Sequence, residues 1–330
     1  MLLEPYYVPI DPGDLRRIAE QLRSADVFTP TFLAPEVDHY DPAIYLQQSH
    51  RFATGTVLRV DRNVFTRLLG MVRGHSPSDA HRISAGVLAF AQCADIDVEP
   101  NIALYEGAQL HGQEAALDEL KSFRIADNVH PGDWAEIALG RCDQVGEVPE
   151  MPMGGPGDSE VDFTMPLRRW RRNYVLCLKL AALELSGGGA SQRLQEFIRW
   201  SYNDFILGGP AIALAAHYLA PNGRRKRLLK SLRSEDRERA IGGVRNAAWD
   251  LTLVSEWLLD IESQEQSSRL VLLTSLDAGV HNLARAVAET SRSANSSEDA
   301  LRVTLRALWG EAAGNSLATE VEGLYGSREA

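Results

Sequence analysis

Cysteine is scarce in this sequence, which has three cysteines among its 330 residues. Cys93, Cys142 and Cys177 are widely and irregularly spaced, and this spacing excludes a disulfide framework and a zinc knuckle built from paired cysteines. The eight histidines also lack the paired spacing of a zinc site. Three separate thiols are typical of a protein in a reducing compartment, so we expect a cytoplasmic location.

Long apolar runs are lacking as well. The longest stretch without a formally charged residue covers residues 205–223, and Gly208, Gly209 and Pro210 interrupt it. Its second half is typical of a buried helix rather than a membrane span. The first residues do not combine a basic start with an apolar segment, so we expect neither a secretion signal nor contact with a membrane.

Charge is unevenly distributed along the chain. The formal net charge is −11, which argues against a general nucleic-acid-binding protein. Residues 165–245, however, contain 16 Lys and Arg against 6 Asp and Glu, a balance of +10, which leaves −21 for the remainder. This asymmetry fits a patch that binds a polyanion, and it fits two solvated basic helices equally well. The side chains that would form such a patch are Arg168, Arg169, Arg171, Arg172, Arg224, Arg225, Lys226 and Arg227.

Two segments have the pattern of buried strands. Residues 56–61 are short, β-branched and mostly apolar, and residues 269–275 form a nearly continuous apolar run. Helical periodicity prevails between them, so the two strands are predicted to lie parallel in one sheet. Weaker strand candidates lie around residues 96–98 and 123–125.

Acidic residues stand at the ends of both predicted strands. Asp61 and Asp277 would meet at one edge of the sheet, where ligands gather in parallel α/β structures. Glu106 and Asp250 stand among apolar neighbours, where burying an acid is costly without compensation. Clustered carboxylates repel one another, and their oxygens suit Mg²⁺ or Mn²⁺. Each acid taken alone also fits a cap, a turn or an exposed helical position.

The first two acidic motifs resemble those of PIN-domain nucleases, an α/β family that includes the ribonuclease toxins of bacterial toxin–antitoxin pairs. Residues 57–64 resemble the first family strand, and the resemblance implies that Asp61 binds metal and that Asn63 supports it. Residues 103–106 resemble the helix that carries the family glutamate, here Glu106.

The last two motifs follow in the family order. Residues 245–250 resemble the helix with the third acid, and the resemblance implies that Asp250 binds metal and that Arg245 supports it. Residues 272–277 resemble the closing motif, in which Thr274 and Ser275 support the fourth acid, Asp277. Asp204 is a rival for the third acid, but 73 residues separate it from Asp277, which is too far for one helix and one strand.

The sequence departs from the family pattern at two places. Arg62 replaces the small residue usual between the aspartate and the asparagine, and it could crowd or charge the site. About one hundred residues must also be inserted between Glu106 and Asp250. The expected fold is therefore α/β, a PIN-like three-layer fold with a parallel sheet and a mostly helical insertion. The expected parts are an N-terminal extension (1–54), PIN-like segments (55–141 and 241–290), a helical, basic insertion (142–240), and a C-terminal helix and tail (291–330).

The resemblance implies an endoribonuclease that hydrolyses RNA phosphodiester bonds with Mg²⁺ or Mn²⁺ held by Asp61, Glu106, Asp250 and Asp277. It further implies a toxin or defence effector, with RNA as substrate and an antitoxin or another regulatory protein as partner. Two other interpretations stay open: a catalytically inactive PIN-like module that binds nucleic acid or protein, and a DNA-directed nuclease of the same fold.

Overall fold

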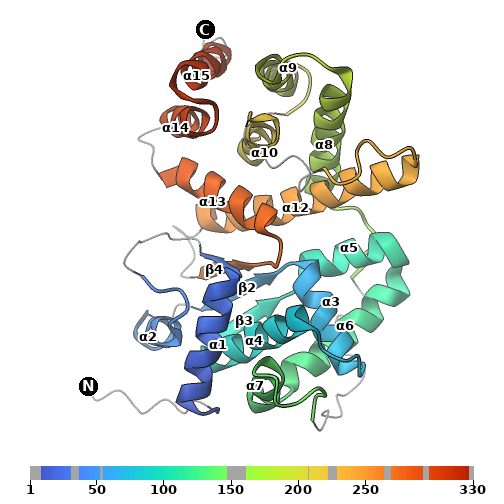
Figure 1. Ribbon diagram of the computed structural model, residues 1–330, viewed down its shortest axis with the longest axis vertical. Coiled ribbons are helices and arrows are strands. Elements are labelled where there is room, and N and C mark those ends of the chain that lie inside the picture. Colours follow the sequence, from blue (N-terminus) through green and yellow to red (C-terminus); the bar gives the residue numbers. More distant parts are fainter. Residues whose placement is uncertain are drawn as a thin grey trace. The chain divides into compact units, whose positions relative to one another are not determined.

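The computed structural model describes residues 9–30, 37–52, 55–146, 161–206, 208–221, 229–263, 269–292 and 297–326 (Figure 1). The chain divides into two compact units, Met1–Pro166 with Leu259–Ala278 and Leu167–Leu258 with Gly279–Ala330. These limits differ from the expected ones, because residues 241–258 belong to the second unit and residues 1–54 to the first. In the described residues, no helix is both long and apolar enough to cross a membrane.

The first unit is a mixed α/β structure around a four-stranded sheet in the order β1-β4-β2-β3. Strand β2 is parallel to β3 and β4, and its Val60 pairs with Thr274. Strand β1 runs antiparallel to β4, so the prediction of a wholly parallel sheet was wrong. The predicted parallel pairing of the two main strands is confirmed. The strands are β1 (Phe28–Pro30), β2 (Thr56–Val60), β3 (Ile96–Glu99) and β4 (Leu270–Thr274).

Helices surround this sheet in the first unit. Helix α4 packs against α1, α3 and α7, and α6 packs against α3 and α5. The candidate strand at residues 123–125 is wrong, because these residues continue the helical periodicity of α6. The helices are α1 (Pro12–Ala25), α2 (Pro42–Phe52), α3 (Arg62–Val72), α4 (Asp79–Cys93), α5 (Asn101–His111), α6 (Gln113–Asn128) and α7 (Pro131–Ala138).

The N-terminal residues contribute to the core of the first unit. Leu15, Ile18 and Leu22 lie on one face of α1 at helical spacing and are buried. Phe28 of β1 stacks on Tyr40 with 5.3 Å between the ring centroids. These residues are therefore part of the fold rather than an appendage to it.

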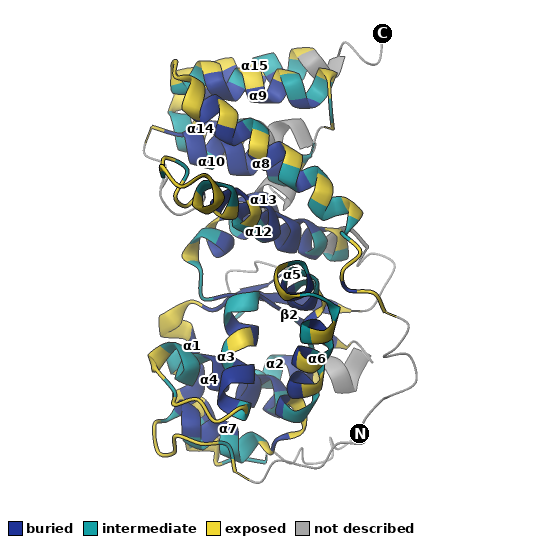
Figure 2. Ribbon diagram, turned by 90° about the vertical axis from the view of Figure 1, so that its right-hand side faces the viewer, coloured by how far each residue is buried: buried dark blue, intermediate teal, exposed yellow. Residues whose placement is uncertain are grey.

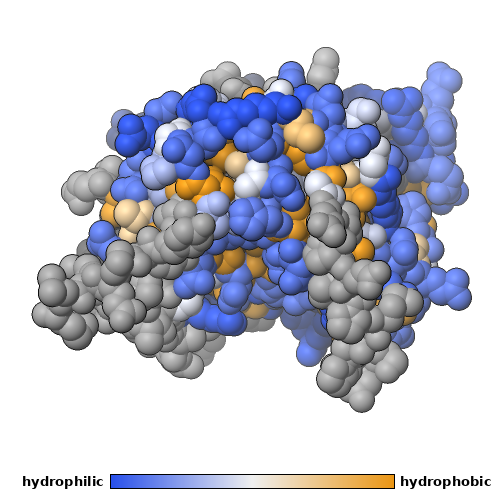
Figure 3. Space-filling model, turned by 90° about the horizontal axis from the view of Figure 1, so that it is seen from below, coloured by the Kyte–Doolittle hydropathy of each residue, from blue (hydrophilic) through white to orange (hydrophobic). Residues whose placement is uncertain are grey.

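Where described residues form the surface in Figure 3, hydrophilic side chains predominate and smaller apolar areas lie between them.

The described part of the second unit is helical. Helix α10 is buried on nearly all sides, as its apolar sequence predicts, and it packs against α8, α9 and α14. Helices α14 and α15 form a hairpin, and α15 packs on α9. The helices that form or enter this unit are α8 (Arg168–Ser186), α9 (Ala190–Asn203), α10 (Gly209–Leu219), α12 (Arg237–Ser263), α13 (Ala278–Arg292), α14 (Ser297–Trp309) and α15 (Glu311–Gly326).

Candidate functional site

The carboxyl ends of the two central strands bring predicted site residues together. Asp61 directly follows β2 and stands at the start of α3. Its backbone N–H donates to the carbonyl oxygen of Thr274 at 3.0 Å, which extends the parallel pairing by one step. Ser275 therefore emerges from β4 beside Asp61, and Asp277 follows two residues later.

A hydrogen-bond network joins these side chains. The Ser275 hydroxyl donates to Asp61 Oδ2 at 2.5 Å. The same hydroxyl oxygen accepts from Asn63 Nδ2 at 3.1 Å and from the backbone N–H of Asp277 at 2.9 Å. The Asn63 amide also donates to Asp61, and its oxygen accepts from the backbone N–H of Leu276 at 3.0 Å. Asn63 and Ser275 thus fix Asp61 and the chain that leads to Asp277.

The carboxyl groups of this cluster are poorly solvated. Asp61 is 8% exposed, and burial raises its pKa, while the bond from Ser275 lowers it and the charge of Asp277 raises it further. Glu106 is half-buried on α5. Burial raises the pKa of Glu106 to about 8, and the neighbouring charge of Asp61 acts in the same direction. Asp61 is therefore coupled electrostatically to both Glu106 and Asp277.

Arg62 makes its own ion pair beside the cluster. Its guanidinium donates to both carboxylate oxygens of Glu119, at 2.8 and 3.0 Å, and to the carbonyl oxygen of Ala103 at 2.7 Å. A Cβ atom on Gly107 would stand 2.5 Å from both the guanidinium and the Glu119 carboxylate, so a side chain at this position would displace the ion pair. The positive charge of Arg62 partly offsets the rise in the pKa of Glu106.

Sequence reasoning missed Glu119 and Gly107. Glu119 lies between Ala116 and Phe123 on the buried stripe of α6, at helical spacing. A buried acid needs a partner for its charge. An acidic residue on the apolar face of a predicted helix was therefore the feature of the sequence that could have identified Glu119. No comparable signal distinguished Gly107 from other helical glycines.

The other predicted site residues belong to the second unit or to the core of the sheet. Asp250 and Arg245 lie on the part of α12 that belongs to the second unit, as does the rival Asp204 at the end of α9. Asp250 accepts from the Asn246 amide at 3.0 Å. Thr274 is buried, and its hydroxyl has no hydrogen-bond partner among the described residues.

The predicted basic patch is only partly described. Arg169 forms an ion pair with Glu256 at 2.7 Å within the second unit. Arg168 and Arg171 are exposed and Arg172 is half-buried. Arg224, Arg225, Lys226 and Arg227 lie outside the described residues.

The cluster satisfies one of the two requirements of a metal site. Carboxylate and amide oxygens are the donors that Mg²⁺ and Mn²⁺ prefer, and raised carboxyl pKa values mark a place short of positive charge. In the described part of the chain, however, no group of three or more His, Cys, Asp or Glu side chains is arranged to hold a metal ion. The oxygen donors of the cluster are therefore of the type that binds a divalent cation, but the described side chains are not positioned as a set of ligands around one.

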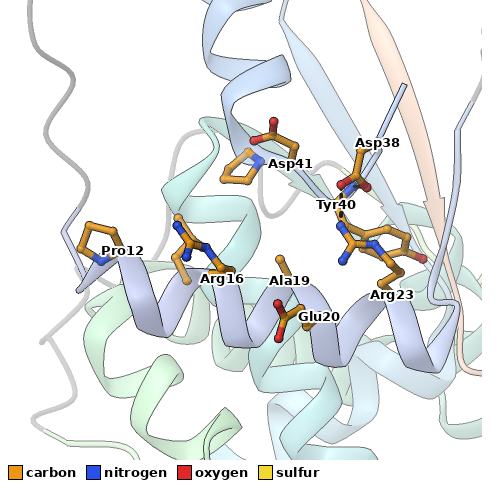
Figure 4. Close-up of a pocket in the computed structure, with 10 residues that line it drawn as sticks. Pro12, Arg16, Ala19, Glu20, Arg23, Asp38, Tyr40 and Asp41 are labelled. Atoms are coloured by element: carbon orange, nitrogen blue, oxygen red, sulfur yellow. Dashed lines mark hydrogen bonds and ion pairs between the residues drawn. The ribbon is translucent and has the colours of Figure 1, made fainter. Parts of the chain in front are cut away.

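A pocket of about 530 Å³ lies elsewhere in the first unit, between α1 and the residues that lead into α2 (Figure 4). Arg23 pairs with Asp38 at 2.5 Å on its wall and stands 5.6 Å from the centroid of the Tyr40 ring. None of the predicted acids lines this pocket. The candidate site is therefore the cluster at the ends of β2 and β4.

Comparison with known proteins does not assign this chain to a family. No family model, curated protein or solved structure matches this chain.

Proposed function

We propose that this protein is a metal-dependent endoribonuclease with a PIN-like catalytic unit. The observation that carries the proposal is the network in which Ser275 and Asn63 hold Asp61 at the ends of two central parallel strands. Glu106 and Asp277 contribute two further carboxyl groups that interact electrostatically with Asp61. Desolvated acids at this edge of an α/β sheet favour a site for chemistry on a charged substrate.

Asp61, Glu106 and Asp277 are the acids that would hold Mg²⁺ or Mn²⁺, and their side chains would have to move together to do so, because the described side chains are not arranged around a metal ion. When bound, such a cation lowers the pKa of water and compensates the negative charge of a phosphodiester. The chain itself supplies the orientation: Ser275 and Asn63 fix one oxygen of Asp61, and the ion pair of Arg62 with Glu119 holds α5 and α6 beside α3. Asp250, Arg168, Arg171 and Arg172 belong to the second unit, and the roles that the resemblance implies for them are metal binding by Asp250 and contact of the three arginines with the RNA backbone.

One observation favours a second candidate function. The described acids do not form a closed ligand group. An inactive PIN-like module that binds nucleic acid or protein would have this arrangement. A DNA-directed nuclease of the same fold would keep the acids and differ in its substrate.

Cleavage of labelled single-stranded RNA and DNA, measured with Mn²⁺, Mg²⁺ or EDTA, tests these functions. We expect cleavage of RNA with either metal and none in EDTA. Asp61→Asn should abolish the activity, and Ser275→Ala should lower kcat by about 10–100-fold because it removes a bond that orients a ligand. Asp118→Asn, at an exposed position on α6, is the matched control and should cleave like the wild type.

The variants also separate the alternatives. Loss of activity in Asp250→Asn but not in Asp204→Asn would include Asp250 in the site. Cleavage of DNA but not of RNA would identify the protein as a DNA-directed nuclease. Cleavage that persists in the Asp61→Asn variant would show that the cluster around Asp61 is not the active site. Absence of cleavage under all conditions, with RNA binding retained, would leave the binding module.

A further inference from the structure

Helix α8 presents an unusual face to solvent in the second unit. Its exposed residues through Leu185 all lie on one stripe, with alternating spacings of three and four residues (Figure 2). This alternation is the heptad spacing of a seam that contacts another helix. The stripe consists of Arg168, Arg171, Val175, Leu178, Ala182 and Leu185.

The composition of this stripe is the reverse of a normal solvent-facing helix face. Exposed helix positions are usually polar or charged, but the last three turns of α8 expose apolar side chains. Val175 is 37% exposed, Leu178 is 40% exposed and Leu185 is 55% exposed. Apolar residues at these positions gain free energy only when another surface covers them.

The first turn of α8 adds positive charge to the seam. Arg168, Arg171 and Arg172 form no ion pair with any residue that the structure describes, whereas Arg169 points to Glu256. From Arg168 to Leu185 the seam runs for about 25 Å at the rise of an α-helix. An occupant must therefore match a cationic first section and an apolar second section over five turns.

We propose that this seam on α8 is the docking site for an acidic amphipathic helix of a partner protein. An apolar stripe on such a helix would cover Val175, Leu178 and Leu185, and its carboxylates would pair with Arg168 and Arg171. The proposal does not depend on the acids at the ends of β2 and β4, but it assigns Arg168 and Arg171 to a protein partner instead of the RNA backbone.

Two other occupants match the seam less well. A second copy of α8 would place arginines against arginines in a parallel pair, and against Ala182 and Leu185 in an antiparallel pair, which leaves the arginine charges uncompensated. An RNA strand would match the arginines, but it has no groups that gain by covering Leu178 and Leu185.

Binding of a synthetic helix to the full-length protein tests the proposal. The probe is a fluorescent peptide of about 21 residues with leucines at heptad a and d positions and glutamates at the flanking positions. Fluorescence anisotropy should show that it binds at least tenfold more tightly than the same peptide with lysines in place of the glutamates. Leu178→Glu should weaken binding at least tenfold, and Arg171→Ala should weaken it and reduce its salt dependence.

Val303→Glu is the matched control, because Val303 is 51% exposed on α14 and lies outside the seam. It should bind the peptide like the wild type, and circular dichroism should show that both glutamate variants are folded. Equal binding of the two peptides, or binding unaffected by Leu178→Glu, would overturn the proposal. A self-association that Leu178→Glu abolishes would assign the seam to a second copy instead. Binding of oligonucleotides but not of the acidic peptide would assign it to RNA.

Discussion

At the scale of single residues, the environment of Glu106 conflicts with the charge of its carboxylate. Burial and the nearby Asp61 raise its pKa to about 8 in the folded protein, against about 4.3 in an unfolded chain. Below pH 4 Glu106 is protonated in both the folded and the unfolded protein, so its raised pKa does not lower the folding stability. As the pH rises towards 8 the unfolded state ionises first, and folding stability falls.

Glu106→Gln should therefore stabilise the metal-free protein increasingly between pH 5 and pH 8.5. We expect a gain on the order of 2 kcal/mol at pH 8.5, a gain several-fold smaller at pH 5 and almost none below pH 4, because glutamine has no proton to lose. Urea denaturation in EDTA across this pH range measures the effect. Glu114→Gln, at an exposed position of α6, is the control and should leave the pH dependence unchanged. A gain that does not vary with pH would contradict the assigned cause.

At the scale of elements, the sequence predicted what depends on local patterns. Strands β2 and β4 could be recognised because their residues are apolar and are buried along almost their whole length. Strand β1 could not, since its three residues form a strand only by pairing with β4. Helix α7 was missed as well, although Trp134 anchors it fully buried in the core.

The candidate site divides in the same way. Asp61, Ser275 and Asp277 could be predicted because each stands where a recognisable strand ends. The pairing of Arg62 with Glu119 could not, because it joins positions 57 residues apart through the packing of α3 on α6. The sequence showed Arg62 as a free charge in the site, whereas the fold provides a partner for that charge.

Helix α12 offers a test of packing between elements, because Gly242 and Gly243 are adjacent but differ in their surroundings. A Cβ atom at Gly242 would meet nothing within 4 Å, whereas one at Gly243 would stand 1.7 Å from the carbonyl oxygen of Lys230. Gly242→Ala should stabilise the protein by about 0.5–1 kcal/mol through helix propensity. Gly243→Ala should destabilise it by about 1–3 kcal/mol, because the segment at Lys230 must move.

Chemical denaturation of the two alanine variants measures this difference directly. Both substitutions add the same methyl group to the same helix, so helix propensity cancels in the comparison. Equal effects of the two changes would show that α12 and the segment at Lys230 do not approach closely.

At the scale of the whole molecule, the topology makes the first unit depend on two distant parts of the sequence. Strand β4 comes from residues 259–278 and lies between β1 and β2, which both precede residue 61. All five residues of β4 are buried, and Leu272 and Leu273 are fully so. Each buried leucine contributes about 1.5–3 kcal/mol, so β4 should hold the two parts together without a covalent link between them.

A protease recognition site inserted between Pro152 and Met153 tests this dependence. Cleavage there separates β1, β2 and β3 from β4 in sequence but leaves the sheet pairing unchanged. We expect the two fragments to migrate separately on a denaturing gel and to elute together, at the volume of the uncut protein, from a size-exclusion column in native buffer. The same protein before cleavage is the control. Fragments that elute separately without denaturant would mean that the link between the fragments, rather than the pairing of β4, holds the first unit together.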